Sequence, residues 1–502
     1  MYRLPALPAL SCRHIPHSSF AMSANQPPRL RDTPSSASTS TSASINDPVT
    51  QRALLWIVAS GFFMQTLDTT IVNTALPAMA RSLGEPVLNM HPVVVAYTLT
   101  MASLTPASGW LADRFGTRRM YFAAILLFSL GSLLCAMASS LPMLLAARVV
   151  QGLGGSMLLP VGRLAVLRAV LRAVPGAQYI AALASISIAG QLGPVVGPVL
   201  GGWLVESLSW HWIFLINLPV GVLGMGAVLY FLPDDSLAGT PRFDLLGCVL
   251  LSACMVAFSL ALDVPFDSHR TGWSITLFLV AALTVLGYWR HASVHPRPLF
   301  RLGLFGEPNF SIGLAGNLVC RIGSSAVPFL LPLLLQVRLG YSPLHAGMVL
   351  LPAAIAGTIA KPWIAPLVKR FGYDRFLLVN TAIVGAAIMS FALITPDWPL
   401  TAAIVQLAIF GASNSMQFAA MNSVTLKGLD KRDAGSGNSL FSMVQMLAIG
   451  LGVTIGGTMV NLFKSEAGTA TNASFQITFA IVGAITLASA WVFRKMDSRY
   501  FQ

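Results

Sequence analysis

The stretch GWLADRFGTRR, residues 109–119, is a short charged turn between two long apolar segments. A partial copy, APLVKRFGYDR, lies at residues 365–375, again between two apolar segments. The two stretches share the tripeptide RFG and align Gly116 with Gly372. The chain therefore contains an internal repeat. Repeats that run in the same direction are typical of membrane transporters, in which two related halves enclose the substrate site between them.

The composition indicates a membrane protein. Of the 502 residues, 55% are hydrophobic and 10% are charged, and the mean hydropathy is +0.71. A helix needs about 20 apolar residues to cross a bilayer, and helices satisfy their own backbone polar groups there. We therefore expect an all-α polytopic membrane protein with fourteen transmembrane helices, at residues 53–76, 91–112, 119–138, 142–167, 178–204, 210–232, 243–262, 273–290, 309–336, 343–367, 376–394, 398–425, 434–462 and 474–493.

The repeat divides these spans into six, two and six. The first residues are rich in Ser, Thr and Pro, which favours disorder, and Met22 is an alternative start to Met1. The expected parts are a disordered cytoplasmic N-terminal tail (1–50), an N-terminal six-helix bundle (51–233), two additional helices with their linkers (234–300), a C-terminal six-helix bundle (301–495) and a cytoplasmic C-terminal tail (496–502).

The positive charges follow a topological pattern. A net charge of +13 would suit a nucleic-acid partner, but most Lys and Arg residues outside the spans fall in alternate segments, beginning with the N-terminal tail. The intervening segments carry Arg81, Arg270, Arg338 and Lys464. By the positive-inside rule, both termini are cytoplasmic. We expect a multi-pass protein of the bacterial inner (plasma) membrane. It contacts the lipid bilayer and binds no nucleic acid.

The cysteines do not indicate a disulfide or a metal site. Four of the five lie in predicted spans and one in the tail, and their spacing matches no metal-binding pattern. We expect them to pack as small apolar side chains. They are Cys12, Cys135, Cys248, Cys254 and Cys320.

Asp68, in LDTTIVNTALP (67–77), is the leading candidate for proton coupling. An ionisable residue inside a span is costly and is by default a functional candidate. Gln65, Thr69 and Asn73 are four residues apart, and Asp68 flanks the face that they form. We expect this polar stripe to line a cavity, where Asp68 would take up and release a proton. The alternative is a hydrogen-bonded Asp that packs between helices.

Arg148 and Gln151, three residues apart in the fourth span, form a second polar strip. The charge of Arg148 requires an acidic or carbonyl partner nearby. We expect Arg148 to take part in proton coupling and Gln151 to face the substrate. A purely structural ion pair is the alternative.

The fifth span combines regularly spaced glycines with prolines. Small residues at a period of four allow helices to approach closely, and prolines interrupt the backbone hydrogen bonds. We expect a tightly packed, kinked helix that seals the cavity as it changes sides, with generic packing as the alternative. The residues are Gly193, Pro194, Gly197, Pro198, Gly201 and Gly202.

Four of these stretches carry a family resemblance. GWLADRFGTRR, LAARVVQGLGG (145–155) and GPVVGPVLGG (193–202) resemble motifs of the major facilitator superfamily, and LDTTIVNTALP resembles a motif of its fourteen-span drug/proton antiporter branch. The whole run is most similar to the MdtD-type multidrug exporters. The resemblance implies the major facilitator fold, with two six-helix bundles and two extra helices.

The resemblance also implies roles for individual residues. It assigns proton coupling to Asp68 with the help of Arg148. It makes the loop after the second span a gate, in which Asp113 docks against the other half near residues 435–439. The expected gating residues are Gly109, Asp113, Arg114, Gly116, Arg118 and Arg119.

The second half places two cations in predicted spans. Asn317 and Arg321 lie on one face of the ninth span, and Lys361 lies in the tenth. We expect all three to line the substrate cavity. Because two cations repel a cationic drug, they favour an anionic substrate or a partner for Asp68. The alternative is that Lys361 extends to the membrane surface and Arg321 pairs structurally.

Together these features predict a proton-coupled exporter of small molecules, of multidrug type. The sequence contains no GxxxxGK[ST] nucleotide loop, and we expect no cofactor beyond the proton gradient, no enzymatic activity and no obligate protein partner. An exporter of small organic anions, such as carboxylates or their metal chelates, is one alternative. A membrane sensor that does not transport is another.

Overall fold

The computed structural model describes residues 48–173, 177–232, 242–263, 271–427, 429, 434–464 and 470–495. These residues are helical apart from turns and short connections, and they contain no strand. The predicted tails at 1–50 and 496–502 fall almost entirely outside this part of the chain. Residues 43–502 belong to one compact unit, so the internal boundaries near residues 233 and 300 remain predictions.

Each predicted span coincides with a helix or a pair of helices. In the first half and the two extra spans, these are α1 (Pro48–Leu83), α2 (Pro92–Phe115), α3 (Thr117–Ala136), α4 (Leu141–Ala173), α5 (Ala177–Ser207), α6 (Trp212–Leu215) with α7 (Asn217–Phe231), α8 (Leu245–Asp263) and α9 (Thr271–Val294). In the second half they are α10 (Pro308–Leu333), α11 (Pro343–Ala360) with α12 (Ile364–Phe371), α13 (Tyr373–Ser390), α14 (Leu400–Lys427), α15 (Ala434–Leu462) and α16 (Asn472–Phe493).

Twelve helical segments among the described residues are long and apolar enough to cross a membrane. The other two predicted spans are α5, with 31 residues, and α14, with 28 residues. α14 carries Gln406, Asn414, Gln417 and Asn422, which lower its hydropathy. Some helices are longer than predicted: α1 continues past Pro77 to Leu83. The predicted all-α membrane fold is confirmed.

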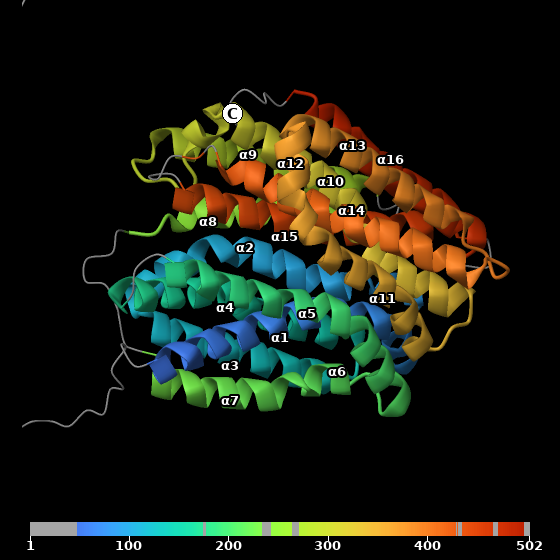
Figure 1. Ribbon diagram of the computed structural model, residues 1–502, viewed down its shortest axis with the longest axis horizontal. Coiled ribbons are helices and arrows are strands. Elements are labelled where there is room, and N and C mark those ends of the chain that lie inside the picture. Colours follow the sequence, from blue (N-terminus) through green and yellow to red (C-terminus); the bar gives the residue numbers. More distant parts are fainter. Residues whose placement is uncertain are drawn as a thin grey trace, which may run out of the picture. The chain divides into compact units, whose positions relative to one another are not determined.

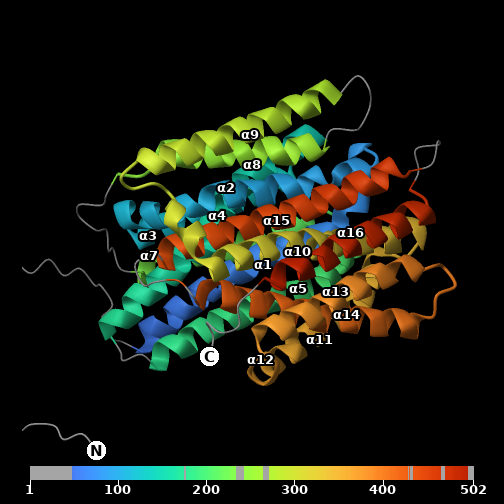
Figure 2. The same cartoon turned by 90° about the horizontal axis from the view of Figure 1, so that it is seen from above.

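The helices pack in two groups that follow the repeat (Figure 1). In the first half, α1 packs on α5, and α4 packs on α2 and α3. In the second half, α11 packs on α14, α10 packs on α15 and α16, and α13 packs on α16. The halves meet mainly where α5 packs on α11 and α2 packs on α15, and α1 also contacts α10. Figure 2 shows α8 and α9 at one edge, where α8 contacts α2 and α15.

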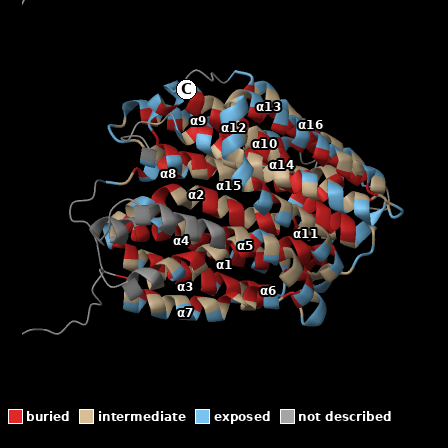
Figure 3. Cartoon of the chain, in the orientation of Figure 1, coloured by how far each residue is buried: buried red, intermediate tan, exposed pale blue. Residues whose placement is uncertain are grey.

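Exposed residues lie along many of the helices (Figure 3), and many of them have large apolar side chains. On α9, the exposed residues include Trp273, Leu283 and Leu286, each at least 64% exposed. A soluble protein rarely exposes a contiguous apolar surface of this kind. In a membrane the same surface contacts lipid, so the exposure agrees with the predicted spans.

The two copies of the repeated loop adopt the same turn. Gly116 ends α2 with φ +87° and Gly372 ends α12 with φ +81°. This left-handed region is strained for residues that carry a Cβ atom. The predicted tight turn at Gly116 is therefore confirmed. The same positive φ at Gly372 explains why the second copy of the loop also has glycine at this position.

Candidate transport site

Asp68 on α1 and Arg148 on α4 form an ion pair inside the first group of helices. Arg148 Nη1 lies 2.7 Å from Asp68 Oδ2, and both side chains are 0% exposed. Gln151 Nε2 donates to Asp68 Oδ1 at 2.8 Å, so both carboxylate oxygens accept a bond. Two charges are costly to remove from water unless they are paired and hydrogen-bonded. This geometry meets that requirement.

Helices α2 and α3 complete the surroundings of the pair. Arg148 Nε donates to the Val93 carbonyl at 3.1 Å, and its guanidinium lies 4.3 Å from the centre of the Tyr97 ring. Gln151 accepts from Arg148 Nη1 at 2.6 Å and donates to Ser132 Oγ at 2.9 Å. Among the described residues, Arg148 Nη2 has no hydrogen-bond partner. The Arg148 guanidinium is thus held by several contacts, but its Nη2 group can still donate a hydrogen bond to a new partner.

Of the polar stripe predicted to line the cavity, Asn73 is confirmed, whereas the placement of Gln65, Asp68 and Thr69 at the cavity is corrected. Asp68 points into the helix bundle, whereas Asn73 lines the central cavity. Five residues along a helix correspond to a rotation of about 140°, so the two side chains leave α1 in different directions. Gln65 is buried, and Thr69 bonds to carbonyls of its own helix. Neither Gln65 nor Thr69 is among the residues that line the cavity.

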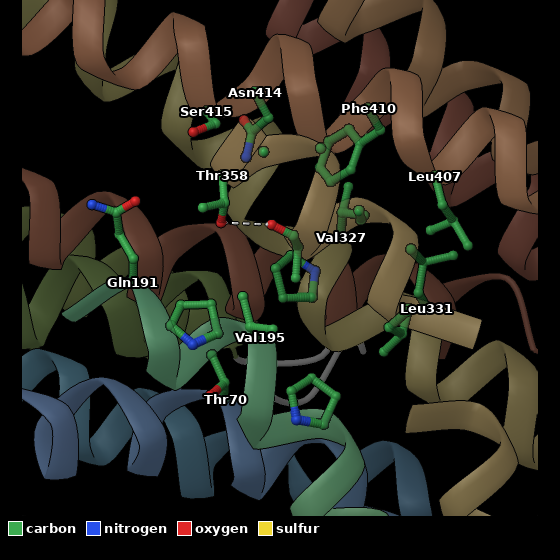
Figure 4. Close-up of a pocket in the computed structure, with 18 of the residues that line it drawn as sticks. Thr70, Gln191, Val195, Val327, Leu331, Thr358, Leu407, Phe410, Asn414 and Ser415 are labelled. Carbon is green, nitrogen blue, oxygen red and sulfur yellow. Dashed lines mark hydrogen bonds between the residues drawn. The ribbon is translucent and has the colours of Figure 1, made fainter. Parts of the chain in front are cut away.

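A cavity of about 350 Å³ lies between the two halves (Figure 4). Helices α1 and α5 form its wall on one side, and α10, α11 and α14 on the other. Figure 4 shows Thr70 and Val195 facing Phe410 and Asn414 across it. Most of the wall is apolar, as in sites for small molecules. Its polar residues are Thr70, Asn73, Thr74, Gln191, Thr358, Lys361, Asn414 and Ser415.

The two predicted cations of the second half occupy different environments. Lys361, at the end of α11, lines the cavity as predicted. Arg321 does not: its guanidinium lies 3.8 Å from the centre of the Phe418 ring, and Phe418 forms the cavity wall. Asn317 accepts from Arg321 Nε at 2.6 Å, so both residues belong to a buried pair behind the wall. The placement of Asn317 and Arg321 in the cavity is therefore corrected, as is that of Gln151, which belongs to the buried ion pair.

The glycines of α5 face two different neighbours. Gly193, Gly197 and Gly201 pack against α1 in the same half, where a Cβ atom would lie 2.2–2.7 Å from Thr66, Thr70 and Ile71. Gly202 faces the other half, where a Cβ atom would lie 2.3 Å from the Pro343 carbonyl oxygen. Pro194 and Pro198 line the cavity between these contacts.

The gating loop is anchored within its own half. Asp113 accepts a hydrogen bond from Arg168 near the end of α4, and Arg118 donates to the Leu229 carbonyl of α7. The predicted docking partner near residues 435–439 forms a different bond, from Ser436 Oγ to the Leu299 carbonyl. Gly109 lies within α2, where an added Cβ atom would meet no heavy atom within 4 Å, and Arg114 is exposed. Among the described residues, Asp113 pairs with Arg168 of its own half and not with residues 435–439.

Several residues of the site were missed in the sequence. Ser132 and Tyr97 contact the buried pair, and Gln191, Asn414 and Phe418 line the cavity. Gln191 and Asn414 are polar residues in apolar spans, which is a usable signal. Phe418 and Tyr97 resemble ordinary core aromatics, so their positions depend on the folded chain.

The family model described as "Major Facilitator Superfamily" matches residues 58–453. The chain belongs to the major facilitator superfamily. Curated proteins similar to this chain include the "Putative multidrug resistance protein MdtD" of Pectobacterium atrosepticum, with 45% identity over 90% of this chain and 97% of that protein. The protein of the same name from Yersinia enterocolitica is 46% identical over 89% of this chain and 95% of its own length.

Solved structures of other transporters share the fold at low sequence identity. A D-xylose–proton symporter has a TM-score of 0.66 and 14% identity, over 90% of this chain and 99% of the symporter. The human organic anion transporter MFSD10 has a TM-score of 0.58 and 14% identity, over 89% of this chain and all of that protein. The chain is thus a multi-pass membrane transporter with the major facilitator fold.

Proposed function

We propose that the chain is a proton-coupled exporter of small molecules, of multidrug type, in the bacterial inner membrane. The 45% identity to proteins named for multidrug resistance supports the substrate class. The distribution of Lys and Arg along the sequence supports cytoplasmic termini. The proton gradient is its energy source, and it needs no other cofactor and performs no enzymatic reaction.

The observation that carries this proposal is the double role of α1. One side of the helix presents Asp68 to Arg148, and another side presents Thr70 and Asn73 to the cavity. Any change at the buried pair that moves α1 also moves the cavity wall. The helix therefore connects a site that can hold a proton with a site that can hold a substrate.

Protonation of Asp68 supplies the driving change. A neutral carboxylic acid no longer balances the Arg148 charge, and an uncompensated buried charge is strongly destabilising. Arg148 must then find another partner or water, and its free Nη2 donor allows such a rearrangement. Release of the proton restores the pair. Alternation between these two states would move α1 relative to α4 once per transported proton.

An exporter of small organic anions is a second candidate, supported by a specific feature. Lys361 lies at the junction of the central cavity and a second cavity of about 770 Å³, since it lines both. The charged residues around the second cavity are basic except for Asp374. A cavity lined by one sign of charge concentrates ligands of the opposite sign. The basic residues are Lys361, Lys369, Arg370, Arg375 and Lys427.

A transport assay in liposomes tests the proposal and separates the two substrate classes. The purified protein is reconstituted, a pH gradient is imposed, and movement of amphiphilic cations and of di- and tricarboxylates is measured in parallel. We expect movement of the cations against their gradient, and its loss when an ionophore collapses the pH gradient. Movement of carboxylates alone would favour the second candidate. No gradient-dependent movement of any compound would overturn the proposal in favour of a sensor.

A further inference from the structure

Three potential metal ligands converge at one end of the α8–α9 pair, away from the transport site. Asp244 immediately precedes α8, His291 lies in the last turn of α9, and His295 follows the end of α9. One ligand atom from each residue lies within 4.8 Å of those from the other two. The sequence-based prediction of no metal site considered the cysteines, and none of them belongs to this cluster.

The two histidines are placed by the geometry of the helix. They are four residues apart, a spacing that puts two imidazoles on one helix face and suits a shared metal ion. The His295 amide donates to the His291 carbonyl at 2.9 Å, so the helical pattern continues to His295. The ring centres are 4.8 Å apart and the rings are inclined by 33°. Both rings are partly exposed, which leaves a path for an ion.

The carboxylate of Asp244 is fixed by backbone hydrogen bonds. It accepts from the Gly247 amide at 2.9 Å and from the Leu299 amide at 2.8 Å, and from His291 Nε2 at 2.7 Å. Burial by itself raises the pKa of Asp244, but the three hydrogen bonds together with the charge of His291 outweigh it and lower the pKa below its usual value. Asp244 is therefore a buried, oriented anion beside two imidazoles.

We propose that Asp244, His291 and His295 bind a divalent transition-metal ion such as Zn²⁺. Imidazole nitrogens and a carboxylate oxygen are ligands that Zn²⁺ accepts, and three protein ligands leave a fourth position for water. The Leu299 and Gly247 amides hold the carboxylate in the way that outer hydrogen bonds orient metal ligands. The ion takes the place of the hydrogen that His291 Nε2 donates to Asp244. This hydrogen moves through solvent to Nδ1, so His291 binds the ion as a neutral imidazole. At His295 the ion replaces the 3.2 Å bond from the Arg297 amide to Nδ1 or uses the other ring nitrogen.

The position of the site connects it to both halves of the transporter. The ring of Phe243, next to Asp244, lies 5.2 Å from that of Trp110, which is on α2 before the gating loop. Leu299, which bonds to Asp244, accepts from Ser436 at the start of α15. A bound ion would hold the linker before the second half more firmly. We therefore expect occupancy of the site to slow the relative movement of the halves.

Zinc binding to the purified full-length protein tests the site. Equilibrium dialysis counts the Zn²⁺ ions bound per chain for the wild type and for the variants His291→Gln, His295→Gln and Asp244→Asn. The control is His345→Gln, which removes an exposed histidine at the start of α11. We expect each site variant to bind one ion fewer, or at least tenfold more weakly, and the control to match the wild type.

Two further measurements keep the test independent of folding and transport. Asparagine also caps helices well, so Asp244→Asn is expected to retain its melting temperature without metal. Co²⁺ added to the wild type should give visible absorption bands of a low-coordinate nitrogen and oxygen site, and these should be lost in His295→Gln. Equal zinc counts in the wild type and the three variants would overturn the proposal. So would a wild type without cobalt bands, and both results would leave the proposed transport function unaffected.

Discussion

Arg148 Nη1 and Asp68 Oδ2 are 2.7 Å apart, and both side chains are fully buried from solvent. The pair joins α4 to α1, and α1 continues into the wall of the central cavity. In our proposal, the carboxylate that takes up the proton therefore lies inside one half of the protein, and the substrate is bound between the two halves.

Replacing Asp68 by Asn should abolish proton-driven efflux. The substitution keeps the shape of the side chain but leaves Arg148 as a buried cation without a counterion, which costs about 3–5 kcal/mol. We expect a lower melting temperature and no response of transport to a pH gradient in liposomes. Ser259→Ala on α8, at a buried polar position away from the pair, is the control for general destabilisation. Normal gradient-driven efflux by Asp68→Asn would remove this residue from the coupling mechanism.

Lys361 and Arg321 should differ in their effects on substrate charge. Lys361 lines the cavity, whereas Arg321 lies behind Phe418. Two unit charges 4 Å apart at an effective dielectric constant of 20 interact by about 4 kcal/mol. We therefore expect Lys361→Gln to slow the movement of any transported anion at least about tenfold and to spare or accelerate that of cations. Arg321→Gln is the matched comparison, and an equal shift of selectivity in both variants would contradict the positions assigned here.

Gly347→Ala should separate the halves at the α5–α11 contact. A Cβ atom there would lie 2.2 Å from the Pro198 carbonyl oxygen, which is backbone of the opposing helix and cannot rotate away. Overpacking of this kind costs about 1–3 kcal/mol. Spin labels at the ends of α5 and α11 should report a population with a longer distance. In Gly226→Ala, where no heavy atom lies within 4 Å of the added carbon, the distance should stay as in the wild type.

Asp113→Asn should change transport more than stability. The side chains of Asp113 and Arg168 are 41% and 16% exposed, and a partly solvated pair contributes at most about 1 kcal/mol. The pair nevertheless fastens the gating loop to α4, so its loss should slow efflux with a small change in melting temperature. Asp374→Asn, at the acidic residue of the repeated loop, is the matched control. A large loss of stability, or equal efflux in the two variants, would argue against a gating role.

The sequence predicted the membrane fold well because the relevant signals are local. Hydropathy over about 20 residues reports a span, and the RFG repeat reports the relation between halves, so each predicted span coincides with helices of the structure. The glycine of the tight turn was found for the same reason, since its positive φ is a property of one residue.

The directions of side chains around each helix were harder to predict. Asp68 and Arg148 are 80 residues apart in the chain, and the sequence left open whether they meet. The same difficulty explains why Arg321 was placed in the cavity, although Phe418 from α14 covers it.

By itself, the sequence determined that this chain spans the membrane many times, as two related halves, with a carboxylate and a guanidinium inside its spans. The tertiary structure decided that these two groups bind each other and that the cavity belongs to other residues. The physical reason is that the apolar pattern of the sequence shows which segments are removed from water. It does not show which neighbour each side of a helix contacts. Which face of a helix meets lipid, a neighbouring helix or the cavity depends on contacts between residues far apart in the chain.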